Sequence, residues 1–484
     1  MEQILYSASK NNLDLKLILK LKRIPFVLGA ALFCGGQAFS VLASEPRIID
    51  EALIDVLPEK ALPQLQEILE KAMRNAPRLT IAGFDLEQAG VNVRMARAPM
   101  LPSISGGYNF GGVREERYTA IAHAAASTTV KTSLMSTYNV GLSQPIYQWG
   151  ALEKGYQSAQ LQRAISARNV AEVRRALATD VRRAYFNLIA AANAREGELQ
   201  GLVNLEKERD FLKQQAADGF ITQNTADYAD VRIKDYKLQL RRSDNSWTEL
   251  WRSFWQMTGI EGVSRLDLPK TIPAVSEYLG PVIGSLAVPV GDSLPSALLN
   301  ADDSIRVERL NYEIQKKRLW PKLALSLSLV QDNRSPDNNS ENPKILTKTY
   351  SAMTTVSWNL FDGFNTQALK QGSLIRQRQL KNARDQAERD YQLGLRNSVE
   401  SLKISWESLL RTEGILNDTR SSAEITQKDF EAGVVPKQAL EAAKAGLVGA
   451  QQAASNARAD YYMQIVSFLS VRGKDPVVTQ VAKK

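Results

Sequence analysis

Thiol and imidazole side chains are almost missing from this chain of 484 residues, which has one cysteine and one histidine. The cysteine, Cys34, lies in an apolar run, Ile24 to Leu42, that follows a basic segment, and this order is typical of a secretory signal peptide. Small residues end the run at Ala43, so we predict a signal peptide over 1–43, with cleavage before Ser44. An uncleaved membrane anchor is the alternative. A chain that starts at Ser44 has no thiol, which excludes thiol catalysis and cysteine zinc sites.

Other signatures of catalysis are also lacking. His123 lies in a stretch rich in Ala, Ser and Thr that offers no partner ligands, so we interpret it as a solvated loop residue. The sequence has no phosphate-cradling glycine loop and no paired-carboxylate site in a plausible cleft. It therefore predicts a protein that is not an enzyme, with no catalytic residue, no cofactor and no metal site.

The positive charge is modest. The formal net charge of +9 falls to about +6 without the first 43 residues, because that segment has five basic and two acidic residues (9 − 3 = 6). No compact run of Lys and Arg with interleaved aromatics is present, which argues against a nucleic-acid partner. We interpret Arg182, Arg183, Arg241 and Arg242 as solvated helix surface, with an anion-favouring lumen as the alternative.

The chain contains an internal duplication. Ser357 repeats Ser143, and Gly433 repeats Gly219, each 214 residues on (357 − 143 and 433 − 219), and the apolar positions between these landmarks stay in phase. Neither intervening segment contains proline, and apolar steps of three and four residues predict coiled-coil helices on the order of 100 Å long. We predict two antiparallel helical hairpins, about 150–258 with its tip at Gly219 and about 364–471 with its tip at Gly433.

Alternating apolar and small polar residues predict four strands, about 103–113, 134–147, 322–331 and 350–362. Pro102 and Pro321 mark the change from helix to strand, and we expect the helix before Trp320 to be about two turns shorter than the one before Pro102. Trp247, Trp251 and Trp255 are expected to form a packed stripe where two helices meet, with an aromatic ligand box as the alternative.

The predicted organisation has five parts. They are the signal peptide 1–43, a first structural repeat 44–258, a Pro/Gly-rich equatorial connector 259–295, a second structural repeat 296–471 and a C-terminal tail 472–484. Four strands cannot close a barrel, which needs roughly eight, and open strand edges are not tolerated in lipid. Three copies would pool twelve strands, with the leucine face toward lipid and the polar face toward water. The predicted fold class is mainly α with a small β part, a trimeric α-barrel topped by a twelve-stranded transmembrane β-barrel.

The duplicated unit, its strand-exit motif Phe361-Asp362-Gly363 and its two glycine tips resemble the outer-membrane efflux protein family, the TolC-like channels. The resemblance covers nearly all of the chain after Ser44. It implies a homotrimer in the cell outer membrane with a helical extension into the periplasm. It further implies a passive exit duct of a tripartite efflux or type I secretion system, coupled to a periplasmic adaptor (membrane fusion) protein and an inner-membrane transporter. A soluble or peripheral periplasmic coiled-coil scaffold is the alternative function.

By this resemblance the helical tips dock the adaptor. The candidate docking residues are Asp218, Gly219, Phe220, Ile221, Thr222, Ala432, Gly433, Val434, Val435 and Pro436. Family members often place carboxylates six and nine residues after the tip glycine, but those positions here are Thr225, Tyr228, Ala439 and Ala442. Asp227 and Glu441 lie eight residues after their glycines, and Asp230 lies one turn on. These three are the candidates for a periplasmic aperture, where like charges would repel and could be bridged by cations; ordinary solvated helix charges are the alternative.

Overall fold

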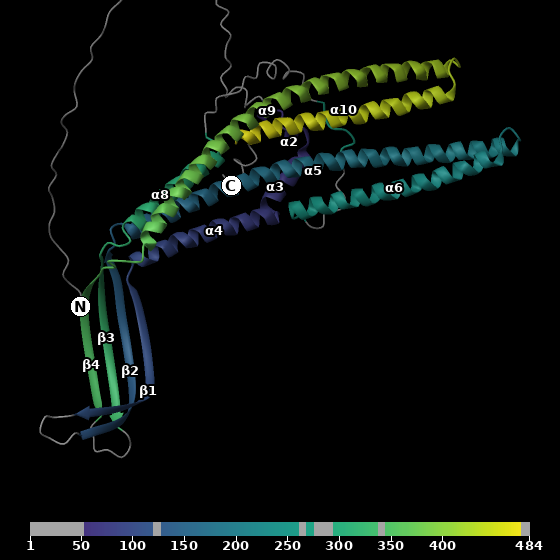
Figure 1. Ribbon diagram of the computed structural model, residues 1–484. Helices are drawn as coiled ribbons and strands as arrows, with labels where there is room; N and C mark the ends of the chain where they lie inside the picture. The colour runs from purple at the N-terminus through teal and green to yellow at the C-terminus, as the bar shows by residue number, and fades with distance from the viewer. Residues whose placement is uncertain (1–52, 120–126, 261–267, 275–293, 337–343, 476–484) are drawn as a thin grey trace, which may run out of the picture. The chain divides into compact units, whose positions relative to one another are not determined.

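The computed structural model describes residues 53–119, 127–260, 268–274, 294–336 and 344–475. The predicted signal peptide, His123, much of the predicted connector and most of the predicted tail lie outside the described residues. Figure 1 shows the order of the elements, which are helices, two strands, long helices, then the same order again.

Proline begins each of the first three helices. They are α2 (Pro58–Ala61), α3 (Pro63–Asn75) and α4 (Pro77–Arg97), and the short 3₁₀ helix η1 (Ala98–Met100) follows. Proline suits the first helical position, because its missing N–H is one that the helix leaves unpaired there. The chain therefore turns at each of these prolines before it reaches the sheet.

Two very long helices repeat one another. Both α5 (Ala151–Ala217) and α9 (Asn365–Glu431) have 67 residues, on the order of 100 Å at about 1.5 Å per residue. Each turns back into a partner, α6 (Gln223–Thr258) and α10 (Lys437–Val471). The buried seam of α9 has leucines at seven-residue spacing, namely Leu395, Leu402, Leu409 and Leu416. Seven-residue spacing is the pattern of a left-handed coiled coil, so the predicted helical hairpins are confirmed.

The four strands form one antiparallel sheet in the order β1-β2-β3-β4. They are β1 (Ser103–Thr119), β2 (Ser127–Tyr147), β3 (Lys322–Pro336) and β4 (Ile345–Ser357). The first three extend beyond the amphipathic stretches, because the more polar residues that follow β1 and β3 and precede β2 still pair. β4 ends before Trp358, so Trp358–Asp362 lies outside the strand.

The register aligns side chains of one kind across the sheet. One row contains Ile104, Leu142, Leu327 and Ala352, and the next contains Ser105, Gly141, Ser328 and Ser351. Neighbouring residues of a strand point to opposite faces, so one face is apolar and the other is small and polar. The predicted division into two faces is confirmed.

Next to the sheet, four helices pack in the same order as the strands. α4 contacts α5, α5 contacts α8 (Ser296–Lys316), and α8 contacts α9. α4 and α8 both have 21 residues, so the prediction that the second would be about two turns shorter is wrong. The first turns of α8 contain polar residues typical of a loop, but Asn300 and Asp303 there are bound by Arg168 of α5, which stabilises the helix.

A core forms where the two hairpins meet the N-terminal helices. Trp251 is 5% exposed, and its ring centroid lies 5.6 Å from that of Trp247 and 5.6 Å from that of Trp255. This stripe packs with Leu65 and Leu69 of α3 and with apolar side chains of α5. The predicted packed stripe is confirmed.

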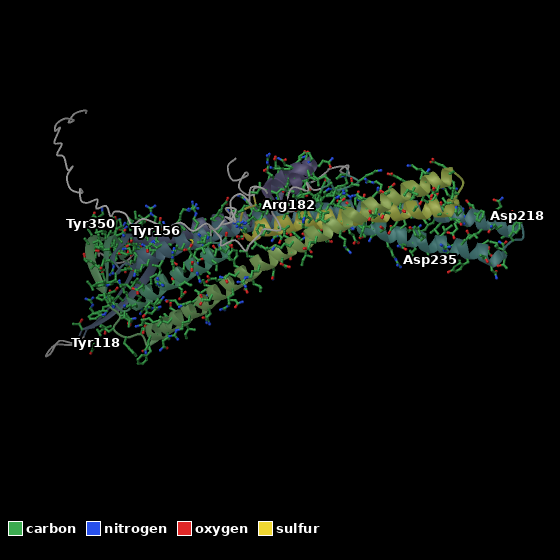
Figure 2. All side chains as sticks on the ribbon, turned by 90° about the horizontal axis from the view of Figure 1, so that it is seen from above. Tyr118, Tyr156, Arg182, Asp218, Asp235 and Tyr350 are labelled. Atoms are coloured by element: carbon green, nitrogen blue, oxygen red, sulfur yellow. The ribbon has the colours of Figure 1, made fainter. Side chains whose placement is uncertain are left out.

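Arg182 corrects a prediction. It is fully buried on α5, where its guanidinium pairs with Glu59 of α2 and with Asp475, which follows α10 (Figure 2). Burial disfavours the charged form, but the hydrogen bond and charge of Asp475 and the charge of Glu59 outweigh burial and hold the pKa of Arg182 above its ordinary value. The solvated-surface interpretation is wrong here, because segments near both ends of the chain cover this residue; Arg183, Arg241 and Arg242 are exposed.

Candidate functional site

The first tip joins α5 to α6 through a left-handed glycine. Gly219 has a φ of 78°, and its N–H donates to the carbonyl of Ala216 over 3.2 Å. The N–H of Phe220 donates to the carbonyl of Gln215 over 2.9 Å. These two bonds form a Schellman motif, which pairs the last carbonyls of the helix and requires a backbone that glycine adopts without a steric cost.

The second tip has the same geometry. Gly433 has a φ of 76° and donates to the carbonyl of Phe430 over 2.9 Å, while Val434 donates to that of Asp429 over 2.8 Å. The two tips therefore match at corresponding positions, although Gly is the single residue that they share over the five predicted docking positions of each tip.

Each tip exposes one apolar side chain directly after its glycine. Phe220 is 79% exposed and Val434 is 73% exposed. The next residues, Ile221 and Val435, are half-buried, and Asp218 and Thr222 are exposed, as are Ala432 and Pro436. A large apolar side chain at a helical turn adds nothing to the core of this chain, so both tips present apolar surface to their surroundings.

The three aperture candidates have different surroundings. Asp227 and Glu441 are exposed and occupy corresponding positions of α6 and α10, and Asp227 accepts a hydrogen bond from Gln223 over 3.2 Å. Asp230 pairs with Lys213 of α5 at 2.8 Å and lies 4.0 Å from Arg209. The hydrogen bond from Lys213 and the charges of Lys213 and Arg209 lower the pKa of Asp230. Asp230 is thus placed among cations of its own hairpin, while Asp227 and Glu441 lie on separate hairpins.

Sequence reasoning missed the turns that lead from strand to long helix. Two consecutive residues are left-handed before each long helix: Trp149 (φ 57°) and Gly150 (φ 77°), then Gly363 (φ 64°) and Phe364 (φ 65°). Trp149 is held by a hydrogen bond from its Nε1 to the carbonyl of Pro321, at 2.6 Å. An aromatic residue beside glycine at both positions was the available signal.

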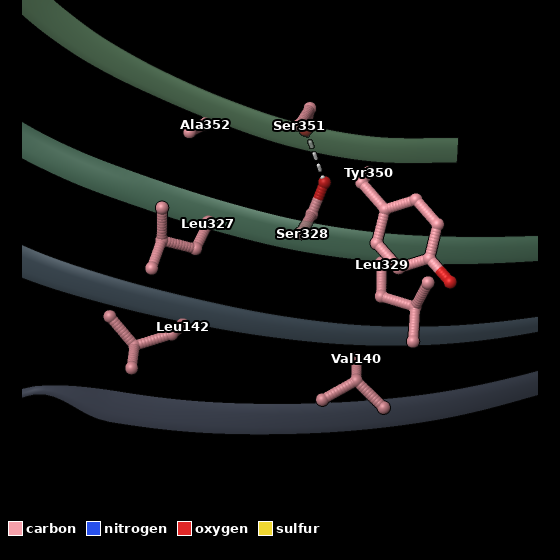
Figure 3. A pocket seen from close by; sticks show the side chains of 8 residues that line it. All are labelled: Val140, Leu142, Leu327, Ser328, Leu329, Tyr350, Ser351 and Ala352. Atoms are coloured by element: carbon pink, nitrogen blue, oxygen red, sulfur yellow. Dashed lines mark hydrogen bonds between the residues drawn. The ribbon is translucent and has the colours of Figure 1, made fainter. Parts of the chain in front are cut away.

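The apolar face of the sheet is open to its surroundings. A hollow of about 410 Å³ lies over β2, β3 and β4 among Val140, Leu142, Leu327, Leu329 and Tyr350 (Figure 3). Ser328 and Ser351 join neighbouring strands by a hydroxyl–hydroxyl contact of 2.7 Å. Tyr350 is 75% exposed, so this apolar surface has no partner within the described part of the chain.

Two searches of the described residues gave no site. No group of three His, Cys, Asp or Glu side chains in the described ranges could hold a metal ion. None of the helices in that part of the chain combines the length and apolarity that a membrane span needs.

Comparisons with known proteins agree with this architecture. The family model described as outer membrane efflux protein matches residues 68–259 and 296–470. The pyoverdine export outer membrane protein OpmQ of Pseudomonas aeruginosa is 23% identical over 328 residues, which make up 66% of this chain and 65% of OpmQ. The chain thus spans slightly less than two thirds of that relative.

Solved structures share the fold at low identity. The CmeC outer membrane channel of Campylobacter jejuni has a TM-score of 0.65 at 14% identity, covering 87% of this chain and 88% of CmeC. The outer membrane protein VceC of Vibrio cholerae has a TM-score of 0.62 at 15% identity, covering 86% of this chain and 97% of VceC. The predicted fold class, mainly helical with a small antiparallel sheet, and the predicted family resemblance are confirmed.

Proposed function

Because the chain belongs to the outer membrane efflux protein family, we propose that it is the passive exit duct of a tripartite efflux or type I secretion system. The observation that carries this proposal is a sheet whose apolar face and outer edges are unpartnered, joined to helices far longer than a compact domain uses. Such a chain is half of a structure that other copies complete.

The sheet edges support a trimer. β1 has 17 residues and β4 has 13, and each is paired along one side in the described part of the chain. Unpaired backbone groups cannot face hydrocarbon, so β1 of one copy must pair with β4 of the next until the ring closes. Three copies give twelve strands, with Leu327 and Leu329 toward lipid and the serine face toward a water-filled lumen in the outer membrane.

The helical tips support coupling to other proteins of the periplasm and inner membrane. The residues around Gly219 and Gly433 expose Phe220 and Val434, which suits docking to a helical adaptor whose apolar residues they would cover. Energy for transport would come from an inner-membrane transporter. Asp227, Asp230 and Glu441 would then line the periplasmic aperture.

The scaffold alternative accounts for the long helices alone. It gives no reason for a four-stranded sheet with exposed leucine, tyrosine and tryptophan side chains, which would be poorly soluble in water.

The test is fractionation of cells that express the full chain, followed by size analysis of the extracted protein. We expect the protein in the outer membrane fraction as a trimer, and we expect its deletion to reduce export by the system it serves. A soluble monomer would overturn the proposal and favour the scaffold.

A further inference from the structure

A polar seam joins the two structural repeats within one chain. On α5, Lys154, Leu161 and Arg168 follow one another at seven-residue spacing and so share one face. Lys154 pairs with Glu313 of α8 at 3.3 Å, and Arg168 donates from its Nε to Asn300 over 2.7 Å. Arg168 also pairs with Asp303, so this face of α5 is the one that contacts α8.

The duplication gives this seam a counterpart between copies. α5 corresponds to α9 at 214 residues on, and α8 corresponds to α4 at 219 residues back, since Pro321 follows Pro102 by 219 (321 − 102). Within one chain α4 and α9 are the two ends of the row α4-α5-α8-α9. If a ring repeats one packing relation, α9 of one copy meets α4 of the next as α5 meets α8.

The residues of α4 that correspond to the seam are apolar and exposed. Ile81 corresponds to Asn300 and is 62% exposed, and Phe84 corresponds to Asp303 and is 62% exposed. Met95, at 63%, lies on the same face, because eleven residues make about three turns. Ala82 and Ala89 are buried on the opposite face. Single exposed apolar residues need no explanation, but three on one face at seam positions do.

α9 has a matching apolar stripe. Ser373 and Gln377 bond to Glu308 of α8, and Ile375, between them, therefore points away from α8 and is 54% exposed. At about 100° per residue, four more exposed side chains fall within about 40° of the direction of Ile375. They are Leu393 (58%), Ile404 (59%), Ile415 (48%) and Ile425 (60%).

The lower part of the hairpins shows the same correspondence. Gln452 of α10 donates to the carbonyl of Asn193 on α5 over 3.3 Å, which joins the two hairpins. The position that corresponds to Gln452 on α6 is Leu238, and it is 50% exposed; Val231, seven residues earlier on the same face, is 49% exposed. The apolar surface that begins on α4 thus has a second part on α6.

From these placements we infer that the Ile375 stripe of α9 packs on the exposed apolar residues of α4 and α6 in a second copy of this chain. The inference rests on the proposed trimer and adds its register: Ala383 of one copy lies beside Ile81 of the next, as Asn169 lies beside Asn300 within the chain at 2.8 Å. The seam within a chain is ionic and polar, whereas the seam between copies is apolar.

Thiol cross-linking on the full chain tests the register. Cys34 is the single native cysteine, so a Cys34→Ala background has no thiol. The variant Ile81→Cys with Ala383→Cys is treated, in outer membranes, with a short thiol-specific cross-linker. The matched positive control, Asn169→Cys with Asn300→Cys, should cross-link within one chain and leave its size unchanged. The negative control, Ile81→Cys with Lys381→Cys, moves the α9 thiol about 160° around the helix.

The expected result is a ladder of covalent dimer and trimer for Ile81→Cys/Ala383→Cys, at least tenfold stronger than for the Lys381 control. A trimer that forms but gives no ladder, while Asn169→Cys/Asn300→Cys reacts, would overturn the register and leave the proposed function intact. A monomer in membranes would overturn both.

Discussion

Arg182→Met is the substitution with the sharpest expected effect on stability. Arg182 is fully buried, and the carboxylates that it pairs with are also buried, Glu59 at 7% exposed and Asp475 at 3%. Methionine fills much of the space but leaves both carboxylates without this cation. Removal of one partner of a buried ion pair costs about 3–5 kcal/mol, so we expect a loss of that size in the free energy of unfolding.

The neighbouring arginine gives a matched control. Arg183 has a side chain that is 61% exposed, and its contact with Asp180 is 4.0 Å long. An exposed pair of this kind contributes about 0–1 kcal/mol, so Arg183→Met should be nearly neutral. Both variants are compared by urea unfolding of detergent-extracted protein, followed by far-UV circular dichroism.

A third variant separates charge from packing. Replacing Glu59 and Asp475 by Gln and Asn in the Arg182→Met background removes the stranded charges at nearly constant volume, and should recover part of the lost stability. Equal losses for Arg182→Met and Arg183→Met would refute the assignment of a buried ion cluster. No recovery in the triple variant would show that packing, and not charge, sets the cost.

Three further predictions concern the helical hairpins. Gly433→Ala should destabilise the second tip by about 1–2 kcal/mol because its φ is 76°, whereas Gly414→Ala, within α9 and equally free of neighbours, should stabilise by about 0.5–1 kcal/mol; equal effects in chemical unfolding would contradict this. Phe220→Asp and Val434→Asp should leave melting temperatures unchanged, because both side chains are exposed, yet reduce export at normal abundance; unchanged export would remove the tips from the docking proposal. Since the pKa of Asp230 is lowered, the stabilisation from its pair with Lys213 is complete above about pH 4 and is lost as pH falls through the lowered value, so Asp230→Asn should flatten the acid side of the stability profile, and an unaltered profile would dismiss this pair.

The fold could be predicted from local patterns because its elements are long and periodic. The leucines of α9 repeat every seven residues, the strands alternate residue by residue, and glycine marks both tips. These signals need no knowledge of distant contacts. The predicted faces of the sheet and the tryptophan stripe follow from the same periodicities.

What the sequence could not provide depended on contacts between distant segments. Arg182 lies in a polar part of α5, and nothing nearby indicates that Glu59 and Asp475 will enclose it. Asp230 was a candidate for an acidic ring, but its cations, Lys213 and Arg209, come from the other helix of the hairpin. The length of α8 was underestimated for the same reason, since the partners of its polar first turns lie on α5.

The paired left-handed residues before α5 and α9 affect how the two halves should be aligned. One half reads Trp149-Gly150 and the other Gly363-Phe364, so the aromatic and the glycine exchange places while both backbones keep positive φ. Matching by residue identity would slide one half by a position and insert a gap. The duplicated ancestry of this chain is therefore best traced through torsion angles at the one point where the letters disagree.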